Sequence, residues 1–196
     1  MFSNDDLQQL IAGKIISNQF PYDTRDEKEV NAHINRLFHR ICRIPHVMCE
    51  AEWNHFGSGY ASFVEFFCYR NEDVSVIQEN PTIREEKREG LIIDVCRLAP
   101  ATILGGDIRY RTTDRRTSEE ISGAYGSLLD GPERLNVPEK LKPLASQLSQ
   151  ALREFGYEEM EAEKLGELLP FKSRIPTLYR MPKDYLILDA FFYWED

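Results

Sequence analysis

Three acidic residues interrupt apolar segments and are the side chains best placed for chemistry. Glu65, Asp94 and Asp189 each lie in the middle of a strongly apolar five-residue segment. If strands carried these carboxyls into one pocket, burial would raise the pKa of one group while a polar setting kept another ionised. Hydrolysis by acid–base catalysis requires that combination, and the same oxygens could bind a metal ion. The alternative is that alternation along each strand turns the acids toward solvent.

Other catalytic and metal-binding motifs are incomplete in this sequence. His33 and His39 are six residues apart, so on a helix they miss the i, i+4 spacing of a two-histidine metal pair. Residues 57–59 read Gly-Ser-Gly, but a strand is expected after them, whereas a nucleophile elbow needs a helix there. The sequence has no phosphate loop of the form GxxxxGKS/T. We therefore expect no metal and no cofactor.

The charge of the chain bears on its partners. A formal net charge of −9 opposes binding to DNA or RNA, because the affinity for phosphates comes from Lys and Arg. The same charge favours an encounter with a basic protein, although it could serve solubility alone. Residues 109–116 contain four arginines and a tyrosine, a composition that suits nucleic acid or, more commonly, nearby acids or a protein interface.

The N-terminus and the cysteines point to the cytoplasm. No run of 18 apolar residues occurs, and two acids stand near the N-terminus where a secretory signal needs basic residues. We therefore expect a soluble cytoplasmic protein without a membrane partner. The cysteines are spaced by 7, 19 and 28 residues, which fits neither a CxxC zinc pattern nor a dense disulfide framework. They are expected to be small buried hydrophobic residues, at positions Cys42, Cys49, Cys68 and Cys96.

The spacing of apolar residues predicts helices first and strands after them. Residues 4–16 have roughly helical spacing, with Asn4 or Asp5 as the cap. Residues 24–27 have the form of a capping box, and helical spacing continues from there to Ile41. From residue 46 the apolar period changes to two, as it does in strands. The predicted strands are residues 47–53, 60–69, 73–78, 91–98 and 108–112.

Two polar stretches between the apolar segments are expected to be loops. Residues 79–89 are highly charged, residues 114–137 are polar and rich in glycine, and Gly105-Gly106 is expected to form a turn. Because binding residues concentrate in loops on a rigid scaffold, acids of the two long stretches are candidate contacts for a basic partner. The candidates are Glu85, Glu86, Glu119 and Glu120. Arginines and lysines in the same stretches leave open a solvated surface of mixed charge.

The C-terminal part is expected to be helical and to return one strand to the sheet. Asn136 and Pro138 mark the start of a helix and Gly156 marks its end, but Pro143 is tolerable only in a first turn, so the alternative is a start nearer Lys142. A short acidic helix should cover residues 161–169. Apolar residues occupy both the odd and the even positions of residues 185–194, which predicts a strand covered on both faces. Its aromatic residues should be buried, namely Phe191, Phe192 and Trp194. Together the elements predict a single α+β domain over residues 1–196, with N-terminal helices, a central mostly antiparallel sheet and C-terminal helices with a final strand.

Four segments together resemble a known group of proteins. They are WNHFGSGYASF (residues 53–63), RLAPATILGG (97–106), PFKSRIPT (170–177) and DAFFYWED (189–196). The chain resembles immunity proteins of bacterial polymorphic and contact-dependent toxin systems, from about residue 50 to its end. The resemblance implies a small cytoplasmic protein that binds and blocks a cognate toxin domain, with no catalytic residues. Such toxins are often nucleases with basic clefts, which an acidic inhibitor suits.

The sequence leaves competing functions open. The leading hypothesis is inhibitory binding of a toxin or another basic protein. The alternative is a hydrolase that uses Glu65, Asp94 and Asp189, which would require these carboxyls to lie within about 10 Å of one another. A structural or adaptor protein is the third reading.

Overall fold

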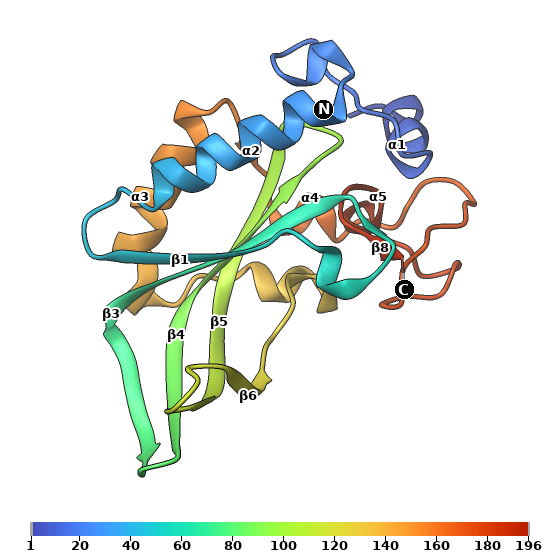
Figure 1. Ribbon diagram of the computed structural model, residues 1–196. Coiled ribbons are helices and arrows are strands. Elements are labelled where there is room, and N and C mark those ends of the chain that lie inside the picture. The colour runs from blue at the N-terminus through green and yellow to red at the C-terminus, as the bar shows by residue number, and fades with distance from the viewer. Residues whose placement is uncertain (1, 196) are drawn as a thin grey trace.

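The computed structural model describes residues 2–195, with the exception of the side chain of His55. The fold is built around one large sheet, with strand order β1-β3-β4-β5-β6 and antiparallel neighbours, to which β7 adds in parallel beside β5 (Figure 1). The strands of this sheet are β1 (Val47–Glu52), β3 (Phe63–Glu79), β4 (Ile83–Cys96), β5 (Ala101–Asp114), β6 (Glu120–Ala124) and β7 (Glu158–Glu159). A second, two-stranded sheet pairs β2 (Tyr60–Ala61) with β8 (Trp194–Glu195).

The helices come before and after the strands of the large sheet. The α-helices are α1 (Asn4–Ile11), α2 (Glu27–Ile41), α3 (Lys142–Glu154), α4 (Ala162–Leu165) and α5 (Ile187–Phe191). Short 3₁₀ turns are η1 (Tyr22–Thr24), η2 (His55–Gly57), η3 (Leu128–Asp130), η4 (Pro132–Leu135) and η5 (Glu139–Leu141). The expected α+β class, with N-terminal helices, a mostly antiparallel sheet and a short C-terminal strand, is confirmed. None of the helices within residues 2–195 combines the length and the apolar character that a membrane span needs.

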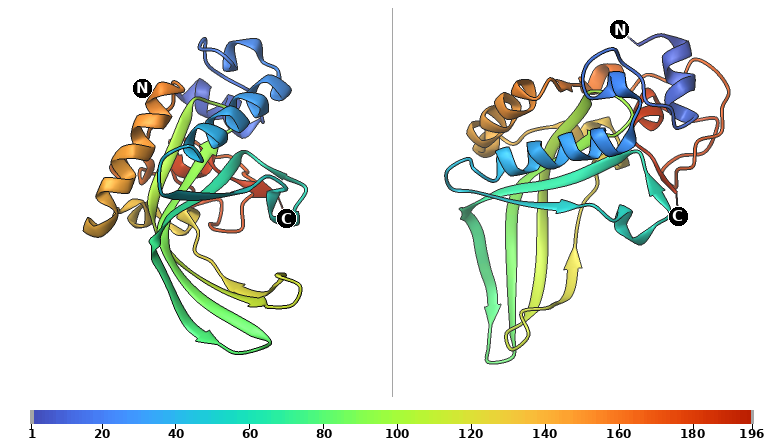
Figure 2. Two further views of the ribbon diagram at one scale, coloured as in Figure 1. Left: turned by 60° about the vertical axis from the view of Figure 1, so that its left-hand side comes forward. Right: turned by 45° about the horizontal axis from the view of Figure 1, so that its top comes forward.

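The two faces of the sheet are covered by different parts of the chain. Alternation along β3 sends Val64, Phe66 and Cys68 to one face, where they pack with residues of α2 and α3. These two helices cover that face of the sheet (Figure 2). We call this side the helix face. Phe63 and Phe67 point to the other side, where they pack with residues of α1 and α5. We call that side the pocket face.

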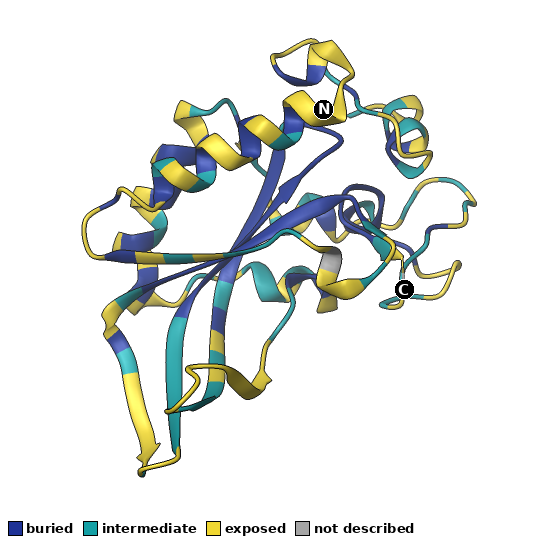
Figure 3. Ribbon diagram, in the orientation of Figure 1, coloured by how far each residue is buried: buried dark blue, intermediate teal, exposed yellow. Residues whose placement is uncertain are grey.

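The sheet continues beyond these layers as a projecting ribbon. Residues 74–89 of the β3–β4 hairpin and residues 108–124 of β5 and β6, here called the distal ribbon, extend away from the helices (Figure 1). Burial falls along the same strands, from fully buried near the helices to half-buried and exposed in the ribbon (Figure 3). β3, for example, is buried from Phe63 to Tyr69 and mostly exposed after that. The ribbon therefore has little apolar core of its own.

The prediction of loops at residues 79–89 and 114–137 is wrong in its main part. The first stretch is a hairpin, whose tight turn is closed by the Asn80 side chain accepting hydrogen bonds from the amides of Thr82 and Ile83. The second stretch contains β6 and two 3₁₀ turns. Apolar periodicity could not find these strands because both faces of the ribbon are partly solvated and carry charged side chains. The predicted strands at residues 60–69 and 73–78 also differ, since β2 is separate and β3 runs through both with register shifts.

Gly105-Gly106 is not a turn. Both glycines lie inside β5, and the segment that contains Arg134 and Pro138 packs closely against them. A Cβ on Gly105 would meet the backbone of Arg134, and one on Gly106 would lie 2.5 Å from the Pro138 ring. Glycine is needed here for close packing and not for a change of direction.

The ends of three helices differ from the predicted ones. α1 is capped by Ser3, which exchanges hydrogen bonds with Asp6, and it ends at Ile11. α2 is capped by Asp26 in place of the predicted box at residues 24–27. α3 begins at Lys142 with a proline in its first turn, which is the later of the two predicted starts and not the one at Asn136 and Pro138, while the short acidic helix covers Ala162–Leu165 only.

The predicted C-terminal strand over residues 185–194 is wrong for most of its length. Residues of this segment form α5, and β8 is limited to Trp194–Glu195. The short helix is buried on nearly all sides, so apolar residues occupy both odd and even positions of the segment. The spacing of apolar residues cannot distinguish such a helix from a strand that is buried on both faces. Phe191 and Phe192 are fully buried as predicted, whereas Trp194 is half-buried.

Candidate functional site

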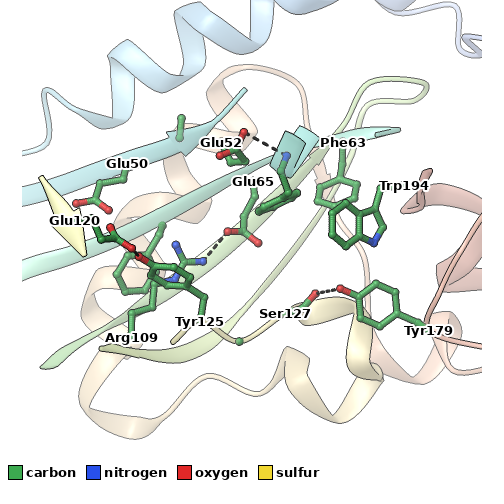
Figure 4. A pocket seen from close by; sticks show the side chains of 14 residues that line it. Glu50, Glu52, Phe63, Glu65, Arg109, Glu120, Tyr125, Ser127, Tyr179 and Trp194 are labelled. Atoms are coloured by element: carbon green, nitrogen blue, oxygen red, sulfur yellow. Dashed lines mark hydrogen bonds and ion pairs between the residues drawn. The ribbon is translucent and has the colours of Figure 1, made fainter. Parts of the chain in front are cut away.

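A pocket of about 480 Å³ opens on the pocket face of the sheet (Figure 4). Acids, one arginine and a large share of aromatic rings line it, drawn from β1, β3, β5, β6 and the C-terminal part. The lining residues are Glu50, Ala51, Glu52, Phe56, Phe63, Glu65, Phe67, Arg109, Glu120, Tyr125, Gly126, Ser127, Tyr179 and Trp194. A pocket of this size and composition is in the range of ligand-binding sites.

Three carboxyls form a row across the sheet beside this pocket. The register places Glu52 of β1 opposite Glu65 of β3, and Glu65 opposite Asp94 of β4. Directly opposed residues share one face and have Cβ atoms about 5 Å apart. Two of the three acids singled out from the sequence are thus neighbours. Glu52 was missed, although the alternation of acids along residues 47–53 could have indicated it.

Asp189, the third acid of that hypothesis, has a structural role in α5. Its Oδ1 accepts a hydrogen bond from Arg180 at 2.7 Å, and its Oδ2 accepts one from the backbone N–H of Leu186 at 2.8 Å. Asp189 does not line the pocket. Asp189 lies in a helix and not in a strand as predicted, and its carboxyl is held by Arg180 and by the start of that helix.

Glu65 lies at the centre of the pocket and is bound to Arg109 (Figure 4). The Arg109 guanidinium donates to Glu65 Oε1 at 2.6 Å and to Asp107 at 3.2 Å. The same guanidinium lies 4.1 Å from the centre of the Phe67 ring and 5.1 Å from that of Tyr125. Burial raises the pKa of Glu65 above its ordinary value, and Arg109 opposes the rise. The ion pair therefore keeps a carboxylate in a place where burial disfavours charge.

Asp94 lies beside Glu65 on the neighbouring strand β4 and is buried away from solvent. Its side chain is 1% exposed, and neither carboxyl oxygen has a hydrogen-bond partner among the residues that the structure describes. Burial, and then the neighbouring Glu65 carboxylate, raise the pKa of Asp94 well above its usual range. Burial at this position therefore favours the neutral form of the Asp94 carboxyl.

Glu52 contributes a negative charge at the mouth of the pocket. Its Oε1 accepts hydrogen bonds from the backbone N–H groups of Asn54 at 2.7 Å and Phe56 at 3.4 Å, so the turn after β1 fixes the side chain. Within residues 2–195, no Lys or Arg forms an ion pair with it. Glu52 is therefore the pocket carboxylate that none of the described lysines and arginines neutralises.

The arginines predicted as a basic run are largely paired with acids. Arg111 contacts Glu120 at 3.0 Å and Glu50 at 3.4 Å, and Glu50 also accepts from Arg88 at 2.7 Å. The Tyr125 hydroxyl donates to Glu120, and burial together with this carboxylate raises the pKa of Tyr125 to about 12. The pairing removes most of the free positive charge that a nucleic-acid site would require.

The four predicted partner contacts do not share one surface. Glu120 lines the pocket, and Glu86 lies on the same side of the sheet, paired with Arg84 and Arg88. Because side chains alternate along β4, Glu85 points to the opposite side. Glu119 is exposed just before β6.

The histidines and cysteines do not form a metal centre. The described part of the chain contains no group of three His, Cys, Asp or Glu side chains that could hold a metal ion. Cys68 and Cys96 are buried as expected, but Cys42 is exposed. Cys49 is half-buried beside Cys68, with 3.1 Å between the two sulfur atoms.

The arrangement can bind an organic cation or exchange protons, since one row holds an ion-paired carboxyl, a buried carboxyl with a raised pKa and a carboxyl without a cationic partner among the described residues. Its aromatic walls add flat, apolar surfaces on the other side of the pocket (Figure 4). Comparisons with protein-family models, with curated proteins and with solved structures give no match to this chain.

Proposed function

We propose that this protein binds a basic partner protein through its pocket face, and that the partner is a toxin domain which the binding neutralises. The observation that supports this proposal is the composition of the pocket. Four glutamates and six aromatic rings line it, and one of the glutamates, Glu52, has no Lys or Arg partner among the residues that the structure describes. A basic surface would be steered toward such a site and held by it. The resemblance to immunity proteins of bacterial toxin systems supports the identity of the partner and a place in the bacterial cytoplasm.

The aromatic content supports binding to a protein. Protein interfaces are enriched in Tyr, Trp, Phe and Arg at their centres, and a few such residues dominate the binding energy. Phe56, Tyr125 and Trp194 lie at the pocket, and the first two are exposed on 44% and 53% of their surface. Isolated exposed aromatic residues are common, but these three line the same pocket as Glu52, the carboxylate without a cationic partner among the described residues.

Co-expression tests this function directly. The toxin candidate is the C-terminal domain of a large secreted-protein reading frame, if one lies directly upstream of the gene for this chain. We expect cells that express this domain to grow only when the chain is co-expressed, and the two purified proteins to associate faster at low salt than at high salt. Glu52→Lys should slow this association, while Glu85→Lys on the opposite side should have less effect. Growth arrest that the chain does not relieve, together with the absence of a complex, would contradict the proposal.

A hydrolase is the second candidate, because Glu65 and Asp94 are adjacent and a third carboxyl, Glu52, completes the row. Against it, Asp94 is sealed from solvent and Glu65 is bound to Arg109. A hydrolase should turn over at least one of a set of chromogenic esters, phosphates and glycosides, and Glu65→Gln should abolish that turnover. Absence of turnover by the parent protein would remove this candidate.

A further inference from the structure

We propose that the pocket binds a guanidinium group, presented by an arginine side chain of the partner protein. The inference rests on the proposed function, because it names the group that the pocket face would recognise. Three features support the inference: hydrogen-bond acceptors that remain available in the pocket, unpartnered polar groups beside the pocket, and the shape of the pocket walls.

Two carboxylate oxygens in the pocket remain available as acceptors. Glu65 uses Oε1 for Arg109, and Glu52 uses Oε1 for backbone amides. No residue that the structure describes donates a hydrogen bond to Oε2 of either side chain. Both line the same pocket from directly opposed positions on β1 and β3. Two neighbouring acceptors of negative charge match the several N–H donors of a guanidinium.

Unpartnered polar groups accompany these acceptors. Asp94, directly opposite Glu65 on the same face, is 1% exposed and has no partner for either oxygen. Trp194 lines the pocket, and its buried Nε1 has no acceptor within the described residues. Buried groups of this kind are uncommon, because leaving each unsatisfied costs about 1–3 kcal/mol. Such groups are expected beside a site that is completed by a ligand.

The walls of the pocket suit a flat cation. Phe56 and Trp194 meet edge to face with their ring centres 5.2 Å apart, and Phe63 lies 6.4 Å from Phe56. Arg109 already demonstrates the chemistry in this pocket, with its guanidinium over the Phe67 ring and against the Glu65 carboxylate. A second guanidinium could use the free oxygens of the same carboxylates and the opposite aromatic wall. A planar guanidinium stacks on rings and pairs with carboxylates in a way that a compact ammonium does not.

Binding of small probes tests the inference. Nα-acetyl-arginine amide, titrated by calorimetry and by the fluorescence of Trp194 in a Trp53→Phe background, should bind with a dissociation constant in roughly the millimolar range expected for one side chain. Its neutral analogue, Nα-acetyl-citrulline amide, should show no binding, and Nα-acetyl-lysine amide should bind more weakly. Free arginine should also bind more weakly, because its own carboxylate would face the glutamates of the pocket. This last comparison distinguishes a side chain within a protein from a free guanidinium metabolite.

Variants locate the probe. Glu52→Gln keeps an oxygen for the backbone amides and removes only the charge, so it should weaken binding of the arginine probe about tenfold without a change in the thermal transition. Glu65→Gln should reduce it further, and Glu85→Gln on the opposite side should leave it unchanged. Equal binding of the citrulline probe, or unchanged binding by Glu52→Gln, would overturn the inference.

The outcome also separates this inference from the proposed function. If the chain blocks its toxin domain but does not bind the arginine probe, the guanidinium site is wrong and the inhibitory function stands. If the probe binds with the expected specificity but no toxin is neutralised, the site stands and the proposed partner is wrong.

Discussion

At the scale of single residues, Asp94 has the environment that differs most from that of an exposed aspartate. It is fully buried beside Glu65, and its pKa in the folded state lies well above its usual range. An unfolded chain loses this proton above about pH 4, whereas the raised pKa keeps it on the folded protein to higher pH. The free energy of unfolding therefore decreases as the pH rises from about 4 toward the folded pKa, by up to about 1.4 kcal/mol per pH unit.

Asp94→Asn should remove this part of the pH dependence, because the amide is neutral in both states. We predict that the thermal midpoint of the variant changes less between about pH 5 and pH 8 than that of the parent. Glu65, whose pKa is also raised, should retain a smaller decrease of the same sign in both proteins. Identical slopes in thermal scans of variant and parent would show that Asp94 does not titrate as described.

Gly90 is a second residue with a specific requirement. A Cβ at this position would lie 2.5 Å from the backbone oxygen of Cys68 and 2.8 Å from the Phe67 ring. Since the Phe67 ring supports the Arg109 guanidinium, Gly90→Ala should disturb the floor of the pocket. We predict a loss of about 1–3 kcal/mol in denaturant unfolding. Gly59→Ala, where an added Cβ meets nothing within 4 Å, is the matched control and should unfold like the parent.

At the scale of elements, the C-terminal segment closes the core on the pocket face. Phe191 and Phe192 of this segment are fully buried, and burial of such a side chain contributes about 2–3 kcal/mol. Removal of residues 189–196 should therefore abolish the cooperative thermal transition. Met181→Ala, in a neighbouring segment but 68% exposed, should retain it. A truncated protein with an unchanged transition would show that the segment is peripheral.

Some elements of the fold leave a clear pattern of apolar residues in the sequence, and others do not. Helices with one apolar stripe, such as α2 and α3, and the buried halves of β3 and β4 were predicted, because burial on one or both sides leaves a periodic apolar pattern. Within the distal ribbon, residues 73–78 and 108–112 were predicted as strands, but the charged start of β4 and all of β6 were not, and neither was α5. Charged strands have no apolar period, and a helix that is buried all round has the pattern of a buried strand. Glu65 and its neighbour Asp94 were found as acids in apolar segments, whereas the positions of Glu52 and Trp194 at the pocket depend on strand register and on the packing of the distant C-terminus.

At the scale of the whole molecule, charge and apolar core occupy different regions. Apolar side chains fill both faces of the sheet near the helices, whereas ion pairs of Glu50, Glu86, Arg88 and Arg111 hold the strands together in and beside the distal ribbon. Ion pairs at partly exposed positions contribute little free energy and are screened by salt. The molecule therefore combines a strongly packed part with a weakly packed one on the same continuous strands.

The packed and the weakly packed parts of the same strands should open at different rates. Backbone amides of β3 that lie under the helices, in residues 64–68, should exchange their hydrogens with solvent only when the entire protein unfolds. Amides of residues 74–79 should exchange by local opening, orders of magnitude faster, and high salt should accelerate them further. Mass spectrometry or NMR of exchanging protein would measure both segments at once, and equal protection along β3 would contradict the division. Local opening of this kind gives the ribbon freedom to adjust to a bound surface while the floor of the pocket keeps its shape.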